Sequence, residues 1–216
     1  MKKAAFYTLG CKVNQYETEA MAELFADSGY EIKEFTEVAD VYVINTCSVT
    51  NMGDRKSRQI IRRAKKLNPN AVIAVTGCYA QTAPDEVLAI EGVNLVLGTK
   101  DRKNIVTLVE ELNTESNINH VSDIMSNHEF EELQIKQYSN RTRAFIKIQE
   151  GCNQFCSYCI IPYARGPVRS RAKDDVVREI KELAHNGFKE IILVGIHVAS
   201  YGVDLGDTTL ESLIMD

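Results

Sequence analysis

Short apolar runs alternate with longer amphipathic stretches along the first half of the chain. The apolar runs are rich in valine, isoleucine and alanine, which is typical of strands that are buried on both faces. The stretches between them repeat apolar residues at helical spacing, and this alternation predicts a parallel α/β sheet. Strands are expected over residues 4–9, 41–44, 71–75 and 93–97, and helices over 14–28, from 50 or 51 to 67, from Pro84 onward, and over 101–112.

The pattern weakens over residues 113–140, where Asn, Ser, Glu and Gln are frequent. We predict a linker there, with a short hairpin over 130–137. A second series then begins, with a strand over 143–149, a helix over 173–186 and a strand over 190–194. The expected organisation is an N-terminal α/β domain over residues 1–138, followed by the start of a (β/α) barrel over 139–216. A complete barrel needs roughly 200 residues or more, so we expect a truncated chain.

Composition narrows the class of protein. Of the 216 residues 44% are hydrophobic, which is enough for an ordinary folded core. A net charge of −5 argues against a uniformly basic nucleic-acid binder, although a local basic surface remains compatible with it. No apolar run is long enough for a signal peptide or a membrane span, so we predict a cytoplasmic protein with no membrane partner. Six cysteines in a reducing compartment indicate metal or redox chemistry before disulfides.

Three of these cysteines lie within eight residues, at Cys152, Cys156 and Cys159, with the spacing C-x3-C-x2-C. We call them the loop triad. No further cysteine follows them, so this loop offers three thiolates and no fourth. Three thiolates can hold three corners of a cubane iron–sulfur cluster and leave the fourth iron open. An open metal position is what a catalytic site needs and what a structural site avoids.

The other three cysteines, Cys11, Cys47 and Cys78, each come just after a predicted strand. We call them the strand-end triad. The carboxyl ends of parallel strands lie on one edge of the sheet, where ligand sites form. A second cluster with an open iron is the sharper interpretation of this convergence. Alternatively, the three are small buried hydrophobic residues, or they bind zinc, which would need a fourth ligand.

Together, these residues resemble the methylthiotransferase family of radical S-adenosylmethionine (SAM) enzymes. The resemblance is carried by residues 8–17, 44–47, 76–81 and 151–166, and extends over essentially the whole chain. The loop triad alone is typical of the wide radical SAM superfamily. Its combination with the strand-end triad is specific to methylthiotransferases.

Within the family, residues 195–202 look like the branch that modifies N6-threonylcarbamoyladenosine at tRNA position 37. The branch that acts on isopentenyladenosine typically carries Gly-Gln-Asn where this chain has Gly195, Ile196 and His197. A third branch modifies an aspartate of a ribosomal protein, and its motifs fit less well. Two interpretations from other classes stay open: an electron-transfer iron–sulfur protein, and an inactive fragment that acts as a binding module.

The resemblance implies two [4Fe-4S] clusters and SAM as cofactors. The cluster on the loop triad would bind SAM at its open iron. When reduced by a donor such as a flavodoxin or ferredoxin, it would cleave SAM to methionine and a 5′-deoxyadenosyl radical, which activates C2 of the adenine. The auxiliary cluster on the strand-end triad would hold the sulfur or methylthio group that is transferred. The expected macromolecular partner is tRNA and not DNA.

The sequence also predicts roles for several individual side chains. Tyr158 can pack on the SAM adenine or, alternatively, only within its own loop. Asn14 and Asn45 are expected to orient the auxiliary cluster. His197 is expected to be a hydrogen-bonded structural residue. Two groups of arginines are predicted to bind RNA. The first group lies on the helix that ends at residue 67, and the alternative for it is a charged helix face that is only solvated. The second group follows the cysteine loop and could instead offset the negative charge of a cluster. These groups are Arg55, Arg58 and Arg62, and Arg165, Arg169 and Arg171.

Overall fold

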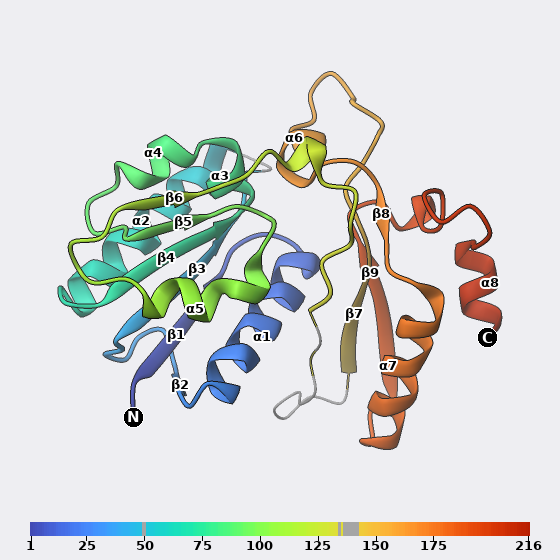
Figure 1. Ribbon diagram of the computed structural model, residues 1–216, viewed down its shortest axis with the longest axis horizontal. Coiled ribbons are helices and arrows are strands. Elements are labelled where there is room, and N and C mark those ends of the chain that lie inside the picture. The colour runs from blue at the N-terminus through green and yellow to red at the C-terminus, as the bar shows by residue number, and fades with distance from the viewer. Residues whose placement is uncertain (49–50, 134, 136–142) are drawn as a thin grey trace.

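The structure is a computed structural model that describes residues 1–48, 51–133, 135 and 143–216. It contains a six-stranded sheet built from the first part of the chain and a three-stranded sheet built from the last part. Helix α1 (Lys12–Asp27) packs against strands of both sheets (Figure 1). The predicted boundary between residues 138 and 139 and part of the predicted hairpin over 130–137 fall outside the described residues.

The larger sheet has the strand order β2-β1-β3-β4-β5-β6, and all neighbouring strands are parallel. This confirms the predicted parallel α/β fold. The edge strands β2 and β6 were not predicted, because each has three residues and no apolar run. Since β6 pairs with β5, the linker prediction is wrong for this segment. The strands are β1 (Lys3–Thr8), β2 (Glu31–Lys33), β3 (Val41–Thr46), β4 (Val72–Gly77), β5 (Leu95–Leu97) and β6 (Ile118–His120).

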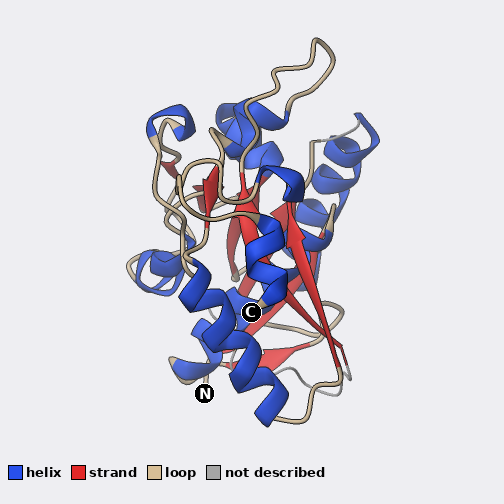
Figure 2. Cartoon of the chain, turned by 90° about the vertical axis from the view of Figure 1, so that its right-hand side faces the viewer, coloured by secondary structure: helices blue, strands red, loops and turns tan. Residues whose placement is uncertain are grey.

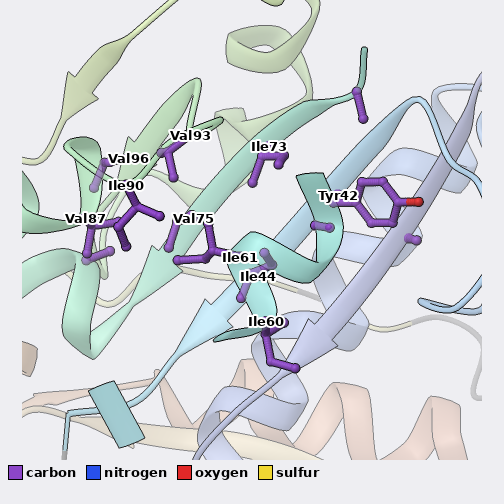
Figure 3. Packing of buried hydrophobic residues seen from close by; sticks show 14 of the residues in the cluster. Tyr42, Ile44, Ile60, Ile61, Ile73, Val75, Val87, Ile90, Val93 and Val96 are labelled. Carbon is purple, nitrogen blue, oxygen red and sulfur yellow. The ribbon is translucent and has the colours of Figure 1, made fainter. Parts of the chain in front are cut away.

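Helices cover both faces of this sheet, so its central strands are buried on both sides. In β3, Tyr42 and Ile44 pack with α2, α3 and α4 (Figure 3), whereas Val41 and Val43 pack with α1 and α5 on the opposite face. Burial on both faces explains why the first four residues of β3, 41–44, form a continuous apolar run. The helices are α2 (Asn51–Leu67), α3 (Cys78–Thr82), α4 (Pro84–Leu88) and α5 (Ile105–Glu110), with the 3-10 turn η1 (Arg102–Asn104) before α5.

Two helices differ from their predicted extents for local reasons. The helix expected from Pro84 onward is the short α4, and a separate helix, α3, precedes it. Ala83 between them is extended in φ at −142°, because the proline ring that follows disfavours the helical conformation at this position. The helix expected over 101–112 begins as the 3-10 turn η1 and becomes α-helical only at Ile105.

The smaller sheet has the order β8-β7-β9, in which β7 (Arg143–Glu150) pairs in parallel with β9 (Glu190–Gly195) and antiparallel with β8 (Arg169–Ser170). Helix α7 (Lys173–His185) covers one side of β7 and β9 (Figure 2). A parallel strand pair with a helix crossover is the repeating unit of a (β/α) barrel, so the predicted barrel start is confirmed. The remaining elements are α6 (Ile161–Arg165), α8 (Leu210–Met215), and the 3-10 turns η2 (Ile124–Ser126) and η3 (Val198–Ser200).

Contacts through α1 and the segment after β6 connect the two sheets. Val13 of α1 packs with Phe145 and Val194 of the smaller sheet. Leu133, from the predicted linker, is buried against Tyr16 of α1, whose hydroxyl donates a hydrogen bond to the Leu133 carbonyl. This segment is therefore packed over the described residues, in contrast to the predicted linker. Among those residues no helix combines the length and apolar character that crossing a membrane requires.

Candidate metal centres

The strand-end triad lies on one edge of the larger sheet, as predicted. Cys47 directly follows β3, Cys78 directly follows β4, and the strand register pairs Thr46 with Gly77, so the two cysteines are neighbours. Cys11 is the N-cap residue of α1, three positions after β1 ends. β1 and β3 are adjacent in the sheet, and the strand order reverses between them. Ligands bind at this kind of switch point in open α/β sheets.

Side-chain hydrogen bonds hold these three loops together. The Asn14 amide nitrogen donates to the carbonyls of Leu9 and Thr46, at 2.8 and 2.9 Å, and so joins the Cys11 loop to the Cys47 loop. The Thr46 hydroxyl donates to the Thr76 carbonyl at 2.6 Å and accepts from the Ala80 amide at 3.3 Å. These bonds join the Cys47 loop to the segment that carries Cys78. Positions far apart in sequence are thereby fixed relative to one another.

Gly10 allows the loops to approach closely. Its φ is +108°, a conformation that side-chain-bearing residues rarely adopt. A Cβ atom at this position would lie 3.2 Å from the Cys47 sulfur and 3.0 Å from the Cys47 Cβ. The sulfur of Cys47 therefore packs directly on the backbone beside Cys11.

The loop triad follows β7 and is held at its base by backbone contacts. The Cys152 amide donates to the Gly166 carbonyl at 3.0 Å, and the Cys159 amide donates to the Cys156 carbonyl at 2.9 Å. Gln149 donates to the Gly151 carbonyl at 2.8 Å and accepts from the His197 amide at 2.7 Å, so the start of the loop is tied to the end of β9. The base of the loop is fixed, while Cys156 itself is exposed.

Both triads fit an iron–sulfur cluster in the type and number of their donors. All six thiols are free, and each triad offers three of them. Over the residues that the structure describes, no three Cys, His, Asp or Glu side chains converge tightly enough to hold a single metal ion. A cubane cluster is larger than an ion and takes one thiolate for each ligated iron, so its ligands lie further apart.

A cluster of buried charges, which the sequence did not predict, lies between the two triads. Glu17 of α1 contacts Arg102 and Arg165, each at 2.6 Å, and Glu150 at the end of β7 contacts Arg165 at 2.7 Å. Every member has less than a tenth of its side chain exposed. We call this set the buried charge cluster. It contains four cations and three carboxylates: Arg102, Lys147, Arg165, Arg169, Glu17, Glu131 and Glu150.

The cations of the buried charge cluster keep the Glu17 and Glu150 carboxylates ionised. Burial by itself raises the pKa of Glu17, but Arg102, Arg165 and Lys147 outweigh it, so the pKa of Glu17 lies below its usual range. The same balance holds the pKa of Glu150 well below its usual range. Burial also raises the pKa of the Cys78 thiol, and the nearby Arg165 opposes that rise. The site is therefore buried, charged and slightly cationic in balance.

The structure places Arg165, Arg169 and Arg171, which the sequence predicted to bind RNA, away from the protein surface. All three are buried, with at most 1% of their surface exposed. Arg165 and Arg169 belong to the buried charge cluster, and Arg171 pairs with Glu179 of α7. Burial beside carboxylates leaves no path to a phosphate. The alternative that such an arginine offsets cluster charge agrees with the position of Arg165 against the Cys78 sulfur.

The remaining predicted residues lie apart from the buried charge cluster. Arg55 and Arg62 are exposed on α2, whereas Arg58 donates a hydrogen bond to the Tyr79 hydroxyl at 2.9 Å. Tyr158, beside the loop triad, is 90% exposed. The His197 ring shares a 2.6 Å hydrogen bond with the Ser200 hydroxyl, in keeping with a structural role.

Both parts of the chain are similar to known protein families. Residues 3–98 match the model of uncharacterized protein family UPF0004, and residues 146–213 match the Radical SAM superfamily. The threonylcarbamoyladenosine tRNA methylthiotransferase MtaB of Bacillus subtilis (strain 168) is 52% identical over 217 residues, which are 100% of this chain and 48% of that protein. This chain resembles the radical SAM methylthiotransferases. It spans about half the length of the curated relatives it matches.

Two further comparisons qualify this resemblance. A tRNA-2-methylthio-N(6)-dimethylallyladenosine synthase of Dictyoglomus thermophilum is 35% identical, over 100% of this chain and 50% of that protein. A solved radical S-adenosylmethionine methyltransferase, TsrM from Kitasatospora setae, with cobalamin and a [4Fe-4S] cluster bound, superposes with a TM-score of 0.59 over 100% of this chain and 52% of its own length. Its sequence identity is 15%, so this likeness supports the fold alone. The radical SAM match implies an iron–sulfur cluster and SAM.

Proposed function

We propose that this chain carries the cofactor-binding part of a radical SAM methylthiotransferase that adds a methylthio group to C2 of N6-threonylcarbamoyladenosine at tRNA position 37. The observation that carries this proposal is the pair of cysteine triads on the two sheets, joined through the buried charge cluster. The 52% identity to a threonylcarbamoyladenosine tRNA methylthiotransferase supports the choice of substrate. We also propose residues 1–138 and 139–216 as the two domains.

The proposal assigns the triads to two [4Fe-4S] clusters. The loop triad would hold the cluster that binds SAM, and the strand-end triad would hold the auxiliary cluster. When bound, these groups supply the electron, the radical and the sulfur that the reaction needs. The chain's own side chains fix the geometry: Gln149 ties the loop triad to β9, and Asn14 ties the Cys11 loop to the Cys47 loop.

Further parts of the proposal concern surroundings and partners. Tyr158 is exposed beside the loop cysteines, where its ring can cover the SAM adenine. An external reductant such as a flavodoxin or ferredoxin would supply electrons, since the cluster that cleaves SAM needs one-electron reduction. Six free thiols suit a reducing compartment, which supports a cytoplasmic location.

Nucleoside mass spectrometry of tRNA tests the proposed substrate. Deleting the gene that encodes this chain is expected to abolish 2-methylthio-N6-threonylcarbamoyladenosine and to accumulate the unmethylthiolated nucleoside. The unaltered gene should restore the product, and the same gene with Cys152→Ala should not. Loss of the methylthio-isopentenyladenosine nucleoside instead would favour a second function, which the 35% identity to a dimethylallyladenosine synthase supports. No change in either nucleoside contradicts both.

The exposed arginines of α2 are predicted to contribute electrostatically to tRNA binding. Affinity should fall as salt rises, because phosphate contacts release counterions. Replacing both Arg55 and Arg62 with glutamine should weaken binding and reduce the slope of log affinity against log salt by about two. The matched control replaces Arg143 and Arg178, which are exposed and paired with Glu190 and Asp175. Equal slopes in the two double variants would show that α2 is only a solvated helix.

A further inference from the structure

Arg165 follows the last cysteine of the loop triad by six residues, so its sequence position suggests a contact with that triad. In the structure it contacts the strand-end triad instead. It is the last residue of α6 and is fully buried. Its Nε donates to the sulfur of Cys78 at 3.4 Å. A terminal nitrogen donates to the Asn14 side-chain oxygen at 2.5 Å, and the same oxygen accepts from the Cys11 sulfur at 3.5 Å. One guanidinium is thus connected to two of the three strand-end cysteines.

Two carboxylates fix the orientation of this guanidinium. Glu17 accepts from both terminal nitrogens of Arg165, at 2.6 and 3.1 Å, and Glu150 accepts from one of them at 2.7 Å. Planar guanidinium groups held by carboxylates in this way have little freedom to rotate. The Nε–H is therefore directed at the Cys78 sulfur by contacts that do not involve the sulfur itself.

The charge balance of the surroundings favours an anionic group at this position. The buried charge cluster has four cations and three carboxylates, so its formal charges sum to one positive charge although each cation contacts a carboxylate. Arg165 is the member of this cluster that touches a cysteine sulfur. A thiolate-ligated metal group on the strand-end triad would supply negative charge where the surplus lies.

The segment that carries Arg165 also contacts the base of the loop triad. The carbonyl of Gly166 accepts from the Cys152 amide at 3.0 Å, and the carbonyl of Ala164 accepts from the Thr99 hydroxyl at 2.7 Å. Residues 164–166 therefore touch the loop triad on one side and the larger sheet on the other. This segment links the two candidate metal centres through consecutive residues.

We propose that Arg165 is a positioning residue of the auxiliary cluster. Its guanidinium donates a hydrogen bond to the Cys78 sulfur and raises the reduction potential of that cluster. It also couples the position of the auxiliary cluster to the loop triad. The inference rests on the proposed function, because it requires a cluster on the strand-end triad. Hydrogen bonds and positive charge at a ligating sulfur favour the more reduced, more negative state of an iron–sulfur cluster. Removing them therefore lowers the potential.

The test isolates the auxiliary cluster by replacing all three loop cysteines with alanine. This background chain is expected to bind about four irons after anaerobic reconstitution. Adding Arg165→Lys keeps a positive charge but removes the directed Nε–H. The midpoint potential, followed by electron paramagnetic resonance, should become more negative by about 59 mV, a roughly tenfold change in the one-electron equilibrium. The control is Arg171→Lys, because Arg171 is also a buried arginine and pairs with Glu179. The midpoint potential of this control variant should match that of the background chain.

A second measurement does not depend on whether Arg165→Lys folds. In the background chain labelled with 15N at arginine, the reduced cluster should show electron–nuclear coupling to a guanidinium nitrogen, and Arg171→Lys should retain it. A background chain that binds no iron contradicts the proposed cluster site. Four irons with no nitrogen coupling, or with potentials of Arg165→Lys and Arg171→Lys that agree, would overturn the role of Arg165 and leave the cluster site standing.

Discussion

Replacing Glu17 with alanine is expected to lower the free energy of unfolding by about 3–5 kcal/mol. The side chain of Glu17 has no exposed surface and contacts Arg102 and Arg165 at 2.6 Å and Lys147 at 3.3 Å. Removing this carboxylate leaves the surrounding cations buried with less compensation, and the unpaired charge is the main cost. Because Arg102 lies between β5 and β6 of the larger sheet and Lys147 lies in the smaller one, the loss should also loosen the contact between the sheets.

Denaturant unfolding measures this effect, with Glu190→Ala as the matched control. Glu190 also pairs with an arginine, Arg143, at 2.7 Å, but about half of each side chain is exposed. An exposed pair of this kind is worth about 0–1 kcal/mol, so the control should stay close to the unsubstituted chain. A Glu17→Ala chain as stable as the Glu190→Ala chain would show that the buried charge cluster does not hold the sheets together.

Sequence patterning predicted the strands that carry a run of apolar residues. β3 and β4 are almost wholly buried and read as continuous apolar runs, so their position and parallel pairing followed from the sequence. The strands that were missed, β2, β6 and β8, have three, three and two residues. Their pairing depends on backbone hydrogen bonds to a neighbouring strand, which leave no hydrophobic period in the sequence.

The positions of the cysteines were predictable for a similar reason, and the buried charge cluster was not. Each strand-end cysteine follows a predicted strand, and parallel topology brings such positions together. Glu17 and Lys147 are separated by 130 positions, and Glu17 and Arg165 by 148. No local spacing relates such residues. The signals available in the sequence were weak: an acidic residue among the apolar positions of α1, and Glu150 directly before the cysteine loop.

Arg165 shows how sequence proximity can suggest the wrong partner. It lies six residues after Cys159, so the sequence assigns it to the loop cysteines or to RNA phosphate. In the structure α6 ends at this residue, and the side chain extends to the edge of the larger sheet, where the Cys78 sulfur accepts its hydrogen bond. The orientation of the Arg165 guanidinium follows from Glu17, which is distant in sequence, and from Glu150, which lies at the end of β7.

Anaerobic reconstitution with iron and sulfide is expected to load about eight irons per chain, four on each cysteine triad. Replacing Cys78 with alanine should reduce this to about four, because three thiolates on the strand-end triad become two. Replacing Cys156 should also reduce it to about four, through the loop triad. The control is Ser157→Ala, which lies between two loop cysteines and offers no thiol, and it should retain the full iron content.

The two cysteine variants distinguish independent clusters from a shared one. Their supports differ, since the Cys78 site is fixed by the Thr46 and Asn14 hydrogen bonds and the loop by Gln149 and Gly166. Loss of one cluster should therefore leave the other, and the double variant Cys78→Ala/Cys156→Ala should bind close to none. If either single substitution removes all the iron, the triads do not hold separate clusters. If Cys78→Ala leaves the iron content unchanged, Cys78 is a buried structural residue and the proposal of sulfur transfer loses its second cluster.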